Sequence, residues 1–189
     1  EISVNRMKNI LLRLQNDYYR NENGEVFNLL ELPVMISNDG YLLKNFLAFA
    51  IKVIGIEPAE NVAEISRGLG IQTISEFFSS KLAEELVSQN GYPRLIIANN
   101  VMAHVPDLMD FVKGLAVLCG PETQISIENP SLANILVEMQ FDTIYHEHYS
   151  YLSTTAVRNI GKMSGLELFK VEQLTVHGGS NRYWLRKSL

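Results

Sequence analysis

The chain has 189 residues, of which 47% are hydrophobic and 20% are charged, and its net charge is -5 at pH 7. These values are typical of a folded globular protein with one domain, or with one domain and a short appendage. The acidic balance argues against a nucleic-acid-binding surface, which needs clustered Lys and Arg to neutralise phosphates.

The single cysteine, Cys119, excludes an intramolecular disulfide and a zinc site of the CxxC type. It lies in an apolar run, where a small core residue is the expected role. The chain has no uncharged apolar stretch of about 18 residues that could span a bilayer. Its first residues also lack the basic and apolar regions of a signal peptide. We therefore expect a cytoplasmic protein with no membrane partner.

Residues 1–32 differ in character from the rest of the chain. Apolar residues recur at roughly helical spacing over 2–19, which predicts an amphipathic helix, and a loop follows over 21–24. From residue 33 onward, short β-branched runs alternate with longer amphipathic runs, a pattern typical of an α/β sheet protein. We therefore expect a helical lead-in over 1–32 and a single α/β domain over 33–189.

The domain is predicted to contain seven strands and six helices. The expected strands are 33–37, 52–57, 71–75, 94–99, 124–128, 166–174 and 177–186, and the expected helices are 41–50, 61–70, 79–89, 107–118, 132–139 and 154–163. No helix-length segment separates the last two strands, so they must form a hairpin. Five strands with helical crossovers and a terminal hairpin predict a doubly wound, Rossmann-like, seven-stranded sheet. That architecture resembles class I methyltransferases more than dinucleotide dehydrogenases.

The turn after the first strand is Ser37-Asn38-Asp39-Gly40, where open α/β sheets bind their ligands. It lacks the GxGxxG fingerprint of dinucleotide sites, and Asp39 would repel a pyrophosphate. S-adenosylmethionine has no phosphate and carries an ammonium and a sulfonium, so the charge of this turn favours that cofactor over NAD. An Asn-Asp-Gly turn that binds no ligand would have the same sequence.

Later strand ends supply further candidates for holding this cofactor. Glu57 ends the second strand, 18 residues after Asp39, and its carboxylate could bind both hydroxyls of a ribose. Glu76 and Phe77 follow the third strand, where they could flank an adenine, although core packing is the simpler role for the phenylalanine. Asn99 and Asn100 follow the fourth strand near the expected methionine end, and two adjacent amides there are hard to explain by packing.

Four consecutive residues after the fifth strand, Tyr145, His146, Glu147 and His148, suit general acid–base chemistry. Histidine titrates near the operating pH of most enzymes, and a neighbouring carboxylate can orient its ring or stabilise its cation. The segment lies on the side of the sheet where the cofactor's methyl group should point.

The same segment also raises the question of a metal. It is not the HExxH pattern of zinc proteases, because position 150 is Ser. A site built from His146, His148 and a distant His104 or His177 would need chance geometry, so we expect no metal. Histidines held by ordinary structural hydrogen bonds are the main alternative for His146 and His104.

Four segments in matching order over about 33–187 together resemble the deoxysugar C-methyltransferase family: SNDG at 37–40, NNVMAHVPD at 99–107, FDTIYHEH at 141–148 and VHGGSNR at 176–182. Members of that family use S-adenosylmethionine to methylate C3 of a nucleotide-linked 4-keto-deoxysugar. The resemblance implies a methyltransferase whose partner is a small-molecule nucleotide sugar.

The resemblance also implies roles for individual residues. His148 would remove the proton next to the ketone, and Tyr145 and Glu147 would assist it or help to hold the sugar and its enolate. The sugar would be bound by the remaining matched residues, His146, His177, Gly178, Ser180 and Arg182. The chemistry is reasonable on its own terms, since a positioned imidazole can remove such a proton if the enolate oxygen is stabilised.

The chain departs from the family pattern in two ways. It has Val34-Met35-Ile36 where the family usually has Glu-Ile-Gly, which removes an acid and a glycine from the cofactor turn. The family's cysteine-rich zinc domain and its C-terminal domain also fall outside this sequence. Two alternatives therefore stay open: a catalytically impaired or non-catalytic relative, and an O- or N-methyltransferase of a small metabolite in which His148 deprotonates a hydroxyl or amine.

Overall fold

The structure is a computed structural model that describes residues 34–36, 42–47 and 51–188; the side chains of 34–36 and 45 are not part of the description. The expected lead-in over 1–32 lies outside these residues. The expected cofactor turn, Ser37-Asn38-Asp39-Gly40, lies outside them as well.

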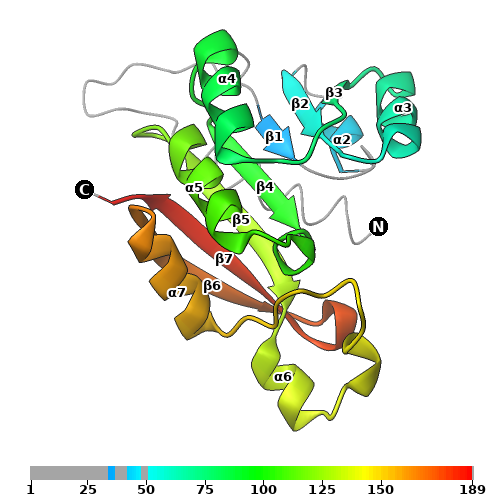
Figure 1. Cartoon of the computed structure of the whole chain (residues 1–189), viewed down its shortest axis with the longest axis vertical. Helices are drawn as coiled ribbons and strands as arrows, with labels where there is room; N and C mark the ends of the chain where they lie inside the picture. The colour runs from blue at the N-terminus through cyan, green and yellow to red at the C-terminus, as the bar shows by residue number, and fades with distance from the viewer. Residues whose placement is uncertain (1–33, 37–41, 48–50, 189) are drawn as a thin grey trace.

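The described strands form one sheet in the order β3-β2-β1-β4-β5-β7-β6, which runs through the middle of the molecule (Figure 1). The first five strands are parallel, and β7 is antiparallel to both β5 and β6, as the predicted terminal hairpin requires. The strand order reverses between β1 and β4, and ligands of open α/β sheets bind beside such a reversal. The strands span β1 Val34–Ile36, β2 Val53–Ile56, β3 Gln72–Ile74, β4 Leu95–Asn99, β5 Gln124–Pro130, β6 Leu166–Leu174 and β7 Ser180–Lys187.

The helices lie between the strands in the chain order expected for a doubly wound fold. Each of α4, α5, α6 and α7 begins at a side chain that accepts a backbone N–H, namely Ser79, Asp107, Ser131 and Ser153. Within the described part of the chain, no helix has the length and apolar character needed to cross a membrane. The helices span α2 Lys44–Leu47, α3 Glu60–Gly68, α4 Ser80–Asn90, α5 Leu108–Leu118, α6 Leu132–Val137 and α7 Thr154–Met163.

Apolar side chains pack on both faces of the sheet. On one face α4, α5 and α7 cover a large cluster that includes Ile96, Leu115 and Ile125. On the other face Phe46 of α2 packs in a smaller cluster with Trp184 of β7. Burial on both faces explains why the parallel strands are nearly continuous apolar runs.

The structure corrects the predicted start of the last strand. The sequence predicts a strand from 177, but residues 176–178 form a short 3₁₀ turn, η4, and β7 begins at Ser180. The turn uses left-handed backbone at His177 (φ 51°), Gly178 (φ 69°) and Gly179 (φ 107°). A Cβ atom at Gly179 would collide with the Asn134 side chain. Both the positive φ and the lack of space therefore favour glycine at this position.

Cys119 is buried at the end of α5, as the sequence predicts, and burial raises the pKa of its thiol from 9.0 to about 11. We expect the native protein to react negligibly with a thiol reagent at pH 8, because the thiolate is the reacting species. Urea-unfolded protein should react at once and release one equivalent of the reagent's chromophore, since the chain has one cysteine. Equal reaction rates for the native and unfolded protein would contradict this placement.

Candidate active site

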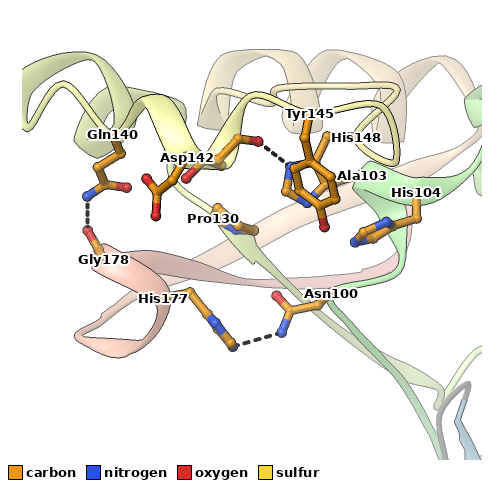
Figure 2. Close-up of a pocket in the computed structure, with 11 residues that line it drawn as sticks. Asn100, Ala103, His104, Pro130, Gln140, Asp142, Tyr145, His148, His177 and Gly178 are labelled. Carbon is orange, nitrogen blue, oxygen red and sulfur yellow. Dashed lines mark hydrogen bonds between the residues drawn. The ribbon is translucent and has the colours of Figure 1, made fainter.

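A cavity of about 460 Å³ opens beside the carboxyl ends of β4 and β5. Three segments that are far apart in the sequence meet there, and Figure 2 shows their side chains around the opening. The cavity is lined by Asn100, Ala103, His104, Pro130, Gln140, Asp142, Thr143, Tyr145, His148, His177 and Gly178.

Two short 3₁₀ turns bring the reactive residues to this cavity. Met102–His104 (η2) follows β4, and Phe141–Thr143 (η3) follows α6. The backbone N–H groups of Tyr149 and Ser150 both donate to the carbonyl of Ala103, at 2.8 and 3.3 Å. The segment that contains His148 is thereby fastened to η2.

The half-buried ring of His148 is held by a backbone carbonyl, because its Nδ1 donates to the oxygen of Thr143 at 2.7 Å (Figure 2). A carbonyl oxygen can only accept, so Nδ1 carries the proton in the neutral ring. The other nitrogen, Nε2, therefore holds the lone pair. A ring fixed in this tautomer can accept a proton at Nε2.

Three further rings pack against His148, and those of His104 and Tyr145 are nearer than that of Tyr151, whose centroid lies 5.9 Å away. The centroid of His104 lies 4.6 Å from that of His148, and the centroid of Tyr145 lies 4.5 Å from it. Burial, followed by the neighbouring His148, lowers the pKa of His104, so this ring is neutral at pH 7. Partial desolvation, followed by the charge of Glu147, raises the pKa of Tyr145, so its phenol stays protonated and can donate.

His104 is therefore a site residue that the sequence prediction missed, since a structural role was expected for it. Its position just after β4, at the same sheet edge as the Tyr145–His148 segment, was the available signal. Gln140, Asp142 and Thr143 were missed as well, although they precede that segment directly.

The other end of the cavity is closed by η4. The Nδ2 group of Asn100 donates to Nε2 of His177 at 3.2 Å, and Nε2 of Gln140 donates to the carbonyl of Gly178 at 2.7 Å (Figure 2). The structure thus places two of the predicted sugar-binding residues, His177 and Gly178, in the same cavity as His148.

Four other predicted residues do not line this cavity. His146 and Glu147 are exposed on the loop. Ser180 is buried and donates to the carbonyl of Val176 at 3.2 Å. Arg182 is also buried, and it forms ion pairs within the sheet, at 2.9 Å to Glu128 and 3.6 Å to Glu172.

The described residues that the sequence predicts to bind the cofactor lie at the carboxyl edge of the sheet. The side-chain oxygens of Asn99 and Asn100 are buried, and neither has a hydrogen-bond partner within the described ranges. Glu57 accepts the backbone N–H of Ala59 at 2.9 Å through one carboxylate oxygen.

Of the residues after β3, Glu76 is exposed, and Phe77 is 77% exposed, so core packing is wrong for this ring. The next residue, Phe78, packs instead against Phe111 in the core. Across the described ranges, no three His, Cys, Asp or Glu side chains are grouped as a metal site would require.

Comparison with known proteins finds a curated relative by sequence. The chain is 35% identical over 144 residues to the C-methyltransferase NovU of Streptomyces niveus, an alignment that covers 76% of this chain and 34% of that protein. The chain therefore spans about a third of the length of this curated relative.

Solved structures share the fold at low sequence identity. Magnesium protoporphyrin IX methyltransferase from Synechocystis PCC 6803 with bound SAH superposes with a TM-score of 0.69 at 13% identity, covering 98% of this chain and 83% of that one. A putative methyltransferase from Bacillus halodurans C-125 superposes with a TM-score of 0.67 at 12% identity, covering 95% of this chain and 99% of that one. These matches confirm the predicted α/β methyltransferase fold.

The family itself is shown by sequence. The model of the methyltransferase domain family matches residues 37–171, which include the expected cofactor turn, β2 to β5 and the His148 segment. The chain belongs to the methyltransferase domain family.

Proposed function

We propose that this chain is the core of an S-adenosylmethionine-dependent C-methyltransferase that acts next to the ketone of a nucleotide-linked deoxysugar. The observation that carries the proposal is the hydrogen bond from Nδ1 of His148 to the Thr143 carbonyl, because it leaves a proton-accepting nitrogen on a ring that lines the cavity. The relative NovU, a C-methyltransferase by name, supports carbon as the methylated atom.

The residues at the sheet edge suit S-adenosylmethionine. Asn99 and Asn100 present two buried amide oxygens that have no partner in the described part of the chain. Buried acceptors favour a ligand that donates, such as the cofactor's ammonium. Glu57 keeps a second carboxylate oxygen for ribose hydroxyls, and the exposed ring of Phe77 beside Glu76 suits an adenine. Bound there, the cofactor supplies an electrophilic methyl group on a sulfonium.

The cavity itself suits the sugar rather than the diphosphate of the proposed substrate. Among the described residues, its lining holds one carboxylate, that of Asp142, and neither Lys nor Arg. A diphosphate needs cationic partners, whereas a carboxylate accepts hydrogen bonds from neutral hydroxyls. We therefore infer that the hydroxyls of the sugar face Asp142 and that the nucleotide lies outside this cavity.

The proposed chemistry follows from the protonation states of His148, Tyr145 and His104. His148 accepts the proton from the carbon next to the ketone at Nε2, while the Thr143 carbonyl holds its Nδ1–H. The protonated phenol of Tyr145 donates a hydrogen bond to the enolate oxygen. Neutral His104 lets His148 become a cation without a second positive charge at 4.6 Å.

Titration calorimetry with S-adenosylmethionine and S-adenosylhomocysteine tests the cofactor half of the proposal. The expected result is binding of one cofactor per chain. Absence of binding to a folded sample would overturn the enzyme proposal and leave the non-catalytic alternative. Methyl transfer to a hydroxyl or amine of the acceptor, established by mass spectrometry of the product, would overturn carbon methylation alone.

A further inference from the structure

We propose that His177 is a positioning residue for the cofactor: its ring holds the Asn100 carboxamide so that the amide oxygen faces the ammonium of S-adenosylmethionine. The inference rests on the proposed function. It replaces the sugar-binding role expected for His177 from the sequence with a role in the other half of the site.

The Asn100 side chain has only one orientation that satisfies its nitrogen. Nδ2 donates to Nε2 of His177 at 3.2 Å, so Oδ1 is the amide atom that this contact leaves for another partner (Figure 2). Oδ1 is buried and has no hydrogen-bond partner among the residues that the structure describes. An acceptor oxygen kept buried in this way is stabilised by a ligand that donates to it, and the cofactor's ammonium is such a donor.

Both partners are fixed by their backbones. Asn100 has a left-handed backbone (φ 54°), and its N–H donates to the carbonyl of Glu128 at 2.7 Å. His177 is also left-handed, with φ 51° and ψ 44°. Left-handed backbone is uncommon for residues other than glycine, so two such residues joined across the cavity point to a constraint at the site.

The turn that carries His177 is itself fastened to its surroundings. The N–H of Gly179 and the hydroxyl of Ser180 both donate to the carbonyl of Val176, at 2.9 and 3.2 Å. The side-chain amide of Gln140 donates a hydrogen bond to the carbonyl of Gly178. The backbone that carries the exposed imidazole of His177 is therefore held in place on both sides of this residue.

Two variants separate positioning from simple folding. In His177→Asn the side chain is too short to reach Asn100, although asparagine tolerates the left-handed backbone. In His177→Gln a longer side chain offers an acceptor to Asn100 again. The probes are S-adenosylhomocysteine, which has the ammonium, and 5′-methylthioadenosine, which lacks the whole amino-acid part.

Calorimetry on the full chain should show that His177→Asn binds S-adenosylhomocysteine roughly tenfold more weakly, as expected for a misdirected hydrogen bond to a charged group. Its affinity for 5′-methylthioadenosine should not change, and His177→Gln should recover most of the loss. Unchanged affinity for both ligands, or equal loss for both, would overturn the positioning role while leaving the proposed function intact. A wild-type chain that binds neither ligand would contradict the proposed function as well.

Discussion

Replacing His148 with alanine is expected to lower the rate of methyl transfer by roughly 10²- to 10⁴-fold, the usual contribution of a positioned general base. The expected loss follows from the tautomer of His148. Its Nδ1–H is held by the Thr143 carbonyl, so Nε2 of a ring that lines the cavity is free to accept the substrate's proton. Single-turnover assays with a nucleotide-linked 4-keto-deoxysugar and S-adenosylmethionine measure it.

The control variant for this experiment lies on the same loop. The side chain of Tyr149 is 61% exposed and does not line the cavity, so Tyr149→Ala should keep near-normal activity. Both variants should bind S-adenosylhomocysteine like the wild type, because neither side chain belongs to the proposed cofactor residues. A His148→Ala variant that retains more than about a tenth of the wild-type rate would exclude this histidine as the base.

The second large effect concerns stability. Arg182→Ala is expected to lower the free energy of unfolding by about 3–5 kcal/mol, because it leaves a buried carboxylate without its cation. Glu128 is fully buried and receives Nη2 of Arg182 at 2.9 Å, while Glu172 lies 3.6 Å from Nη1 of the same guanidinium. Urea unfolding followed by circular dichroism measures the change as a shift in midpoint.

An ion pair elsewhere on the hairpin provides the comparison. Arg186 and Glu167 pair at 3.0 Å with side chains that are 50% and 47% exposed. Exposed pairs contribute about 0–1 kcal/mol, so Arg186→Ala should shift the midpoint little. If the two arginine variants lose equal stability, the buried pair between β5 and β7 does not stabilise the sheet more than an exposed pair does.

Elements whose signals are local could be predicted from the sequence. The sequence predicts β6 over 166–174 and α7 over 154–163, and both are observed with these bounds. In α7 the N-terminus is fixed by Ser153, which accepts the N–H of Ala156. The cluster from Tyr145 to His148 could also be found from the sequence, because its residues are consecutive.

Features that depend on contacts between distant strands could not be predicted. The β5–β7 register places Arg182 opposite Glu128, and no local pattern reveals that this guanidinium is used inside the sheet. The meeting of His104 with His148 likewise depends on how η2 packs against the later loop. The predicted last strand begins at 177, inside the turn that precedes β7. The left-handed backbone of His177 ends the strand pattern there, and hydrophobic periodicity does not reveal such a backbone.

Solvent deuterium exchange tests most directly whether His148 removes a proton from the carbon beside a ketone. With S-adenosylhomocysteine bound in D₂O, the wild-type chain should incorporate deuterium at that carbon of a nucleotide-linked 4-keto-deoxysugar without methylating it. His148→Ala should show no exchange above the uncatalysed rate. Methyl transfer by the wild type without any such exchange, or exchange that persists in His148→Ala, would contradict the assignment of His148 as the base.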